Sequence, residues 1–155
     1  FAKKIHAMLD RSISTILDCG EDGLSANVVK SLISMAKGEN IDEGVDYKKA
    51  IEIFAQGVEA VKQRGKADVG EKTMMDVLIP VANCLKDGVQ NNKEINEILT
   101  EAVQVAEEGM LSTKDLLATK GRASFLGERA KGHIDPGARS SQLMIKTVCE
   151  SVIQK

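Results

Sequence analysis

The stretch DPGARSSQLMIKTVCESV, residues 135–152, contains both the start of a helix and the apolar stripe that follows it. Asp135 is a good N-cap, and Pro136 would occupy the first helical position, where its missing N–H is not needed. Apolar side chains then recur at the three- and four-residue spacing of a helix that buries one face: Met144, Ile145, Val148, Cys149 and Val152. This pattern predicts a C-terminal helix that begins after Asp135.

The same period recurs upstream and predicts five more helices, within residues 2–18, 24–37, 46–65, 74–87 and 92–117. Asp46 is the expected N-cap of the third, and Pro80 should kink the fourth or loosen its first turns. No stretch alternates apolar and polar residues as a strand would, and two prolines in 155 residues favour long helices. We therefore expect one all-α domain over residues 1–155, an antiparallel bundle or ring of about six amphipathic helices joined by short loops.

The composition argues against several classes of protein. The net charge of −2 does not suit a nucleic-acid binder, and basic residues alternate with acidic ones, so no polybasic membrane patch occurs. No apolar run approaches the ~20 residues of a membrane span, and no signal peptide is visible. Cys19, Cys84 and Cys149 lack the CxxC or CxxH spacing of zinc sites, so we expect free thiols in a reducing cytoplasm.

Three connections contain more glycine and charge than turns between helices need: residues 18–23, 64–73 and 120–139. In an up-and-down bundle these three connections would share one rim. Helix N-termini and glycine backbone at such a rim favour phosphate, to which arginine makes forked contacts. The charged side chains available there would be Arg64, Lys72, Arg122, Arg129 and Asp135. The residues alone therefore point to a ligand that bears phosphate.

Simpler interpretations exist for part of this rim. Gly65 and Gly70 could be a helix end and a turn glycine, and GKADVGEKT is not a Walker loop because Glu71 replaces its second glycine. The 118–135 connection has no such explanation, since loops of this length without an apolar period are uncommon in compact domains. It contains Phe125 and several basic residues and does not look disordered. We interpret it as a lid over a ligand.

Two long stretches carry a family resemblance. RGKADVGEKTMMDVLIP (64–80) and GRASFLGERAKGHIDPGARSS (121–141) resemble the two C-terminal signature stretches of the nucleotide-binding L subunit, or L domain, of dihydroxyacetone kinases. They occur in the family's order, and the helical pattern around them fits, so the resemblance covers essentially the whole chain. It implies an all-α barrel with ADP or ATP at one rim, and a cytoplasmic phosphotransferase (glycerone kinase) subunit that works with a dihydroxyacetone-binding K subunit or domain.

The resemblance also implies ligand roles, position by position. The family residues that match Gly65, Thr73 and Met74 lie at the nucleotide, and the arginine that matches Arg122 reaches its phosphates. The Asp-Pro-Gly triplet that matches Asp135-Pro136-Gly137 contacts the nucleoside. No residue of this chain is identified as catalytic.

The chain departs from the family at the metal site. The family places two Mg²⁺ ions on aspartates of a GDGDxGxN-type loop before its second helix, and this chain has no such loop. CGEDGLSAN (19–27) aligns instead with a later Gly-Ser-rich stretch that contacts phosphate, where Glu21-Asp22 would repel phosphate unless a metal intervenes. We expect a chain that lacks the family's N-terminal helices and metal ligands, although the family implies Mg²⁺.

Two functions are consistent with these observations. The first is the nucleotide-binding subunit of a dihydroxyacetone-type kinase, which positions ADP or ATP with Mg²⁺ for transfer to a small ketose on the K subunit. The phosphoryl donor would be free ATP or a phosphotransferase-system protein. The alternative is a degenerate, non-catalytic member that acts as a regulatory or interaction module. Because the chain begins at Phe1 rather than Met, we expect part of a competent subunit, and the upstream sequence would distinguish the two.

Overall fold

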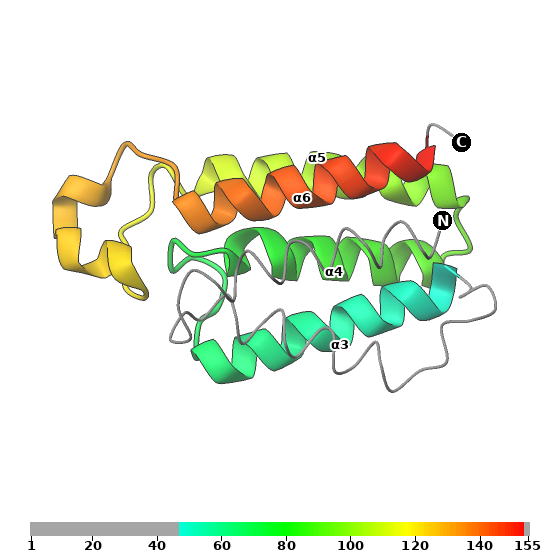
Figure 1. The fold of residues 1–155 in the computed structure, drawn as a ribbon, viewed down its shortest axis with the longest axis horizontal. Coiled ribbons are helices and arrows are strands. Elements are labelled where there is room, and N and C mark those ends of the chain that lie inside the picture. The colour runs from blue at the N-terminus through cyan, green and yellow to red at the C-terminus, as the bar shows by residue number, and fades with distance from the viewer. Residues whose placement is uncertain (1–46, 154–155) are drawn as a thin grey trace, which may run out of the picture. The chain divides into compact units, whose positions relative to one another are not determined.

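The computed structural model describes residues 47–153, and all regular structure within them is helical. The elements are α3 (Tyr47–Gly65), α4 (Met75–Gln90), α5 (Ile95–Ser112), the 3-10 helix η1 (Arg122–Ala130) and α6 (Pro136–Ile153) (Figure 1). The prediction of a helical bundle is confirmed for this part of the chain. The two helices expected upstream and the expected N-cap Asp46 lie outside the described residues. None of the described helices is both long and apolar enough to cross a membrane.

The chain divides into two compact units between Val61 and Lys62. Most of α3 belongs to the first unit, and it buries Ile51, Val58 and Val61 at the helical spacing that the apolar stripe predicted. Gly65 is the last residue of α3. The loop that enters α4, and α4, α5, η1 and α6, belong to the second unit, which contains the candidate site.

α5 is the central helix of the second unit, because it packs along both α4 and α6, which contact each other less (Figure 1). Its buried stripe repeats every four residues, and Ala102 and Ala106 within it have no exposed surface. Small side chains at these positions let both neighbouring helices lie close to α5. α4 contributes four buried apolar residues to this core: Met75, Val77, Val81 and Leu85.

Two glycines bring α4 and α5 together. A Cβ on Gly88 of α4 would lie 2.7 Å from Cγ1 of Ile98, and a Cβ on Gly109 of α5 would collide with the main-chain oxygen of Asp76. In a regular helix that oxygen accepts the N–H of residue 80, but Pro80 has no N–H to donate. Gly109 therefore covers the carbonyl group that Pro80 leaves without its helical partner, and α4 continues through the proline.

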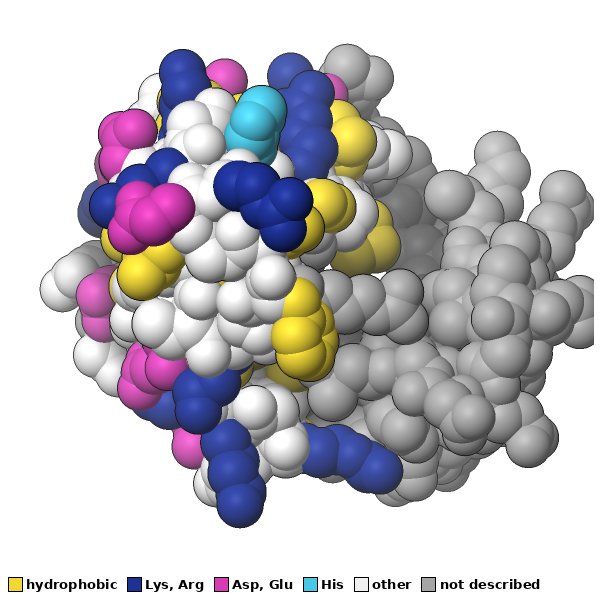
Figure 2. Space-filling view, turned by 90° about the vertical axis from the view of Figure 1, so that its left-hand side faces the viewer, with side chains coloured by type: hydrophobic (Ala, Val, Ile, Leu, Met, Phe, Trp, Pro, Cys, Tyr) yellow, Lys and Arg dark blue, Asp and Glu magenta, His cyan; other side chains and the backbone are white. Residues whose placement is uncertain are grey.

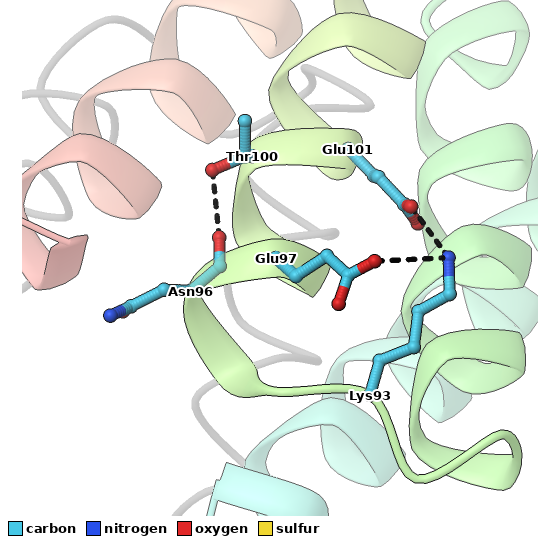
Figure 3. A network of polar contacts seen from close by, with 5 residues as sticks. All are labelled: Lys93, Asn96, Glu97, Thr100 and Glu101. Carbon is cyan, nitrogen blue, oxygen red and sulfur yellow. Dashed lines mark hydrogen bonds and ion pairs between the residues drawn. The ribbon is translucent and has the colours of Figure 1, made fainter.

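The turn between α4 and α5 is fastened by Lys93 (Figure 3). Its Nζ lies 2.5 Å from Oε1 of Glu101 and 3.9 Å from Oε1 of Glu97. The hydrogen bond to Glu101 raises the pKa of Lys93. Thr100 Oγ1 donates to the main-chain oxygen of Asn96 at 2.7 Å. These groups are partly exposed, so they fix the geometry of the turn more than they add to stability.

The last helix begins as predicted but buries a different face. Pro136 is its first residue, and Asp135 Oδ2 accepts the N–H of Ala138 at 2.8 Å, as an N-cap should. The predicted stripe was wrong at Met144 and Val148, which are 62% and 57% exposed. Helical period alone does not tell which flank of a broad apolar face meets the neighbouring helix. The fully buried positions of α6 are Ala138, Ser141, Gln142 and Cys149.

The cysteines within the described residues are free thiols, as expected. Cys84 is half-buried and Cys149 is buried, while Cys19 lies outside the described part of the chain. Burial raises the pKa of Cys149 to about 11. This thiol therefore stays protonated and unreactive near neutral pH.

Gly109→Ala should destabilise the protein by about 1–3 kcal/mol, because the added methyl group meets a main-chain oxygen that moves only with α4. Urea unfolding followed by circular dichroism measures the free energy of unfolding. Gly65→Ala is the matched control, since a Cβ there meets nothing within 4 Å. We expect this control to be unchanged or slightly more stable. Equal losses in the two variants would contradict a close approach at Gly109.

Candidate functional site

A buried lysine joins the segments that meet at one end of the second unit. Lys72 is 2% exposed and lies in the loop of residues 66–74, which we call the α4 entry loop. Its Nζ donates to the carbonyl oxygens of Thr113 and His133, each at 2.5 Å. Thr113 directly follows α5, and His133 precedes α6. One ammonium group therefore ties the α4 entry loop to both ends of the α5–α6 connection, residues 113–135.

The two ends of the α5–α6 connection are also bonded to each other. The N–H of Gly132 donates to the carbonyl oxygen of Lys114 at 2.8 Å, and the N–H of Asp135 donates to Oγ1 of Thr113 at 3.0 Å. Thr113 is fully buried, and its Oγ1 donates in turn to the carbonyl oxygen of Met110 at 2.7 Å. The connection thus leaves and returns through a closed base and carries η1 at its far end (Figure 1).

The fifth helix is shorter than predicted. The apolar stripe extended to Leu117, but α5 ends at Ser112 and Leu117 is 40% exposed. The hydroxyl group of Thr113 donates a hydrogen bond back to the last turn of α5, and Nζ of Lys72 donates one to the carbonyl oxygen of Thr113. Both bonds turn the chain away from the helix axis, and neither is visible in the periodicity.

Asp76 organises the start of α4. Its carboxylate is 1% exposed, with Oδ1 accepting the N–H of Gly70 at 2.5 Å and Oδ2 accepting the N–H of Thr73 at 2.8 Å. Thr73 Oγ1 accepts the N–H of Met75 at 3.1 Å, so Thr73 and Asp76 cap the helix reciprocally. Sequence reasoning missed Asp76, although the Thr-x-x-Asp spacing resembles the signature of a capping box.

Two carboxylates and one ammonium group share this buried end. Asp135 is 8% exposed, and desolvation raises its pKa. Hydrogen bonds from the N–H groups of Ala138 and Gly137 and the charge of Lys72 oppose the rise, while the carboxylate of Asp76 adds to it. Within the described residues every buried side-chain nitrogen or oxygen has a hydrogen-bond partner. The polar network is therefore complete without a ligand.

The starts of α4 and α6 lie side by side at this end. A Cβ on Gly137 would lie 3.6 Å from both the main-chain nitrogen and Cβ of Met74, and 3.0 Å from Oδ2 of Asp135. The structure thus brings together Thr73 and Met74 with the Asp-Pro-Gly triplet, as expected. The 64–73 and 120–139 connections do share one rim. Residues 18–23, the third connection expected there, lie outside the described part of the chain.

The other two expected ligand residues, Gly65 and Arg122, lie at the ends of helices. Gly65 ends α3, and the left-handed conformation belongs to the next residue, Lys66, with φ 47°. Glycine at position 65 is therefore not required by the backbone, and a Cβ there would meet open space. Arg122 is the first residue of η1, and its side chain is not among those that the structure describes.

The expectation that Lys72 is a cation for phosphate was wrong, because its ammonium group is buried on two carbonyl oxygens. Figure 2 views the end of the molecule that carries η1, where Lys and Arg side chains stand out with acidic ones among them. The exposed cations of the α5–α6 connection with described side chains are Lys114, Lys120, Arg129 and Lys131. These side chains are accessible to an anionic ligand.

The described residues do not fit a Mg²⁺ site. Residues 47–153 contain no group of three or more His, Cys, Asp or Glu side chains that could hold a metal ion. Asp76 and Asp135 already accept main-chain N–H groups. Glu21 and Asp22 lie outside the described residues. Within residues 47–153 this end therefore offers no set of side chains that could serve as metal ligands.

Residues 11–150 match the family described as the DAK2 domain. Three relatives are ADP-binding DhaL subunits of dihydroxyacetone kinases. The subunit of the PEP-dependent kinase 1 from Listeria innocua is 40% identical over 123 residues, which are 79% of this chain and 56% of the relative. The subunit of the PEP-dependent Escherichia coli kinase is 38% identical over 152 residues, 93% of this chain and 72% of the relative. The subunit of the PTS-dependent Lactococcus lactis kinase is 41% identical over 101 residues, 65% of this chain and 47% of the relative. The chain thus spans about half the length of the first and third relatives.

Asp135→Asn should change how stability depends on pH. The pKa of Asp135 in the folded protein lies above its usual 3.8, so the folded state holds this proton more tightly. Relative to the Asn variant, which caps the helix but cannot ionise, the wild type should lose stability as the pH rises from about 4 through the raised pKa. Urea unfolding between about pH 3.5 and pH 7 measures both proteins. A stability difference that stays constant over this range would contradict the raised pKa.

Proposed function

The chain belongs to the DAK2 domain family, and we propose that it forms the nucleotide-binding part of a dihydroxyacetone-type kinase subunit. It holds ADP or ATP where the α4 entry loop meets the base of the α5–α6 connection, at the rim of a helical barrel. Relatives named as ADP-binding subunits of PEP- or PTS-dependent dihydroxyacetone kinases support this assignment. The phosphoryl group passes to a small ketose on a partner K subunit or domain in the cytoplasm.

The observation that carries the proposal is the contact between the starts of α4 and α6. Met74 lies beside Gly137, which brings together residues from the two stretches that resemble the L-subunit signatures. The carboxylates of Asp76 and Asp135 already cap the positive ends of both helix dipoles. The exposed cations of the α5–α6 connection therefore supply the attraction for the negative charge of a phosphate group.

Individual residues then take defined roles. Thr73 Oγ1 accepts the N–H of Met75, which leaves its hydroxyl proton available to donate to a phosphate oxygen. Arg122 reaches the phosphates from η1, and Asp135-Pro136-Gly137 borders the nucleoside. The open space beside Gly65 admits part of the ligand. We assign no phosphoryl-transfer step to the described residues, because they do not fit the Mg²⁺ that the family uses.

Arg122→Ala should weaken ADP binding about tenfold to a hundredfold. A hydrogen bond between a guanidinium group and phosphate contributes about 1.5–3 kcal/mol. Isothermal titration calorimetry of the intact protein with ADP in the presence of Mg²⁺ measures the affinity.

Lys86→Ala is the matched control, because it removes one exposed positive charge from α4. Position 86 lies about 16 Å along the helix from Met75, so we expect unchanged ADP affinity. Equal losses in the two variants would mean that total charge, and not a contact from Arg122, sets the affinity. A wild-type protein that binds no ADP would refute the proposal and favour a non-catalytic regulatory or interaction module.

A further inference from the structure

Lys72 combines two features that are each unusual for lysine. Its side chain is 2% exposed, and its φ of 58° lies in the left-handed region that side chains other than Gly, Asn and Asp rarely adopt. Lys66 in the same loop has φ 47° but is exposed, so the left-handed backbone does not by itself bury the side chain. A strained conformation of this kind persists only where its surroundings enforce it.

The surroundings of Lys72 are the two ends of the α5–α6 connection. Thr113 offers its carbonyl oxygen at the C-terminus of α5, where the negative end of the helix dipole attracts a cation. His133 offers its carbonyl oxygen just before the cap of α6. Both oxygens lie 2.5 Å from the same nitrogen, so one atom sets the separation of the two ends.

The other hydrogen bonds of the base have a different role from those of Lys72. The bonds from Gly132 to Lys114 and from Asp135 to Thr113 join the connection to itself. Lys72 joins the connection to the α4 entry loop, in which Thr73 directly follows Lys72. Thr119 Oγ1 also donates to Oε1 of Glu71, but that contact is exposed and 3.4 Å long.

We propose that Lys72 is a positioning residue that pins both ends of the α5–α6 connection to the α4 entry loop. The connection then closes as a lid by moving η1 about a fixed base. The bending points are glycines with positive φ beyond the base, namely Gly121 and Gly127. The effect on nucleotide binding rests on the proposed function, whereas the pinned base does not.

Limited proteolysis with trypsin tests the pinned base, because residues 114–131 contain several lysines and arginines. Lys72→Met should raise the cleavage rate within this segment about tenfold, since the unpinned base opens more often. Lys66→Met is the matched control from the same loop and should be cleaved like the wild type. Lys72→Arg keeps the positive charge but has to fit a larger group into the same buried space, so it should restore only part of the protection. Mass spectrometry assigns the cleavage sites.

Two outcomes of this experiment would overturn the pin. One is a folded Lys72→Met protein whose residues 114–131 are cleaved at the wild-type rate. The other is faster cleavage spread equally over α4, α5 and α6, which would show general destabilisation and no specific release of the base.

Hydrogen exchange of the wild type gives an answer even if Lys72→Met does not fold. The amides of Gly132 and Asp135 donate the bonds of the base and should be protected like those of α5. The amides of residues 124–129 should exchange much faster. Base amides that exchange as fast as residues 124–129 would refute a fixed base.

ADP titration with Mg²⁺ tests the positioning role separately. Lys72→Met should weaken ADP binding about tenfold, because the lid and the α4 entry loop lose their shared base, while Lys86→Met on α4 should bind like the wild type. Wild-type affinity in the Lys72→Met protein would overturn the positioning role. A wild type that binds no ADP would refute the proposed function and the positioning role. The comparison of cleavage rates without nucleotide would still test whether Lys72 pins the base of the connection.

Discussion

The candidate site, where the starts of α4 and α6 meet, depends on one buried ammonium group. Removing a charged group from water is costly unless hydrogen bonds and opposite charge replace the lost hydration. Lys72 finds both, in the carbonyl oxygens of Thr113 and His133 and in the nearby carboxylate of Asp135. Thr113 lies at one end of the α5–α6 connection, His133 and Asp135 lie at the other, and Lys72 lies in the α4 entry loop, so these three segments must be in place before the charge is accommodated. The arrangement is therefore all-or-none at this end.

The parts of the fold that sequence predicted well are those with local causes. The start of α6 was predicted because Asp135, Pro136 and the amide that they cap lie within a few residues of one another. The end of α5 was not predicted correctly, because it depends on Lys72, which is remote in the sequence. The buried face of α6 was also predicted only in part. Apolar period locates a broad stripe, but the neighbouring helix decides which edge of it is covered.

The candidate site shows the same division. Resemblance to a family pointed to Thr73, Met74 and the Asp-Pro-Gly triplet, which the structure brings together at one end. It could not reveal that Asp76 holds the loop on which the first two lie. Lys72 was misjudged for a physical reason, since sequence reports a charge but not whether water reaches it. Charge in a glycine-rich loop suggests ligand binding, whereas here it supports the loop itself.

The close contacts of Gly88 and Gly109 have a mechanical consequence. Gly88 faces Ile98 near one end of the α4–α5 pair, and Gly109 faces Asp76 near the other. Two such contacts about 18 Å apart along α4 prevent it from sliding or rotating against α5. These two contacts fix the register of the helix pair at both ends, and with it the position of the candidate site. Because Thr73 and Met74 lie at the start of α4, the packing at Gly88, remote from the candidate site, helps to set where these residues lie beside α6.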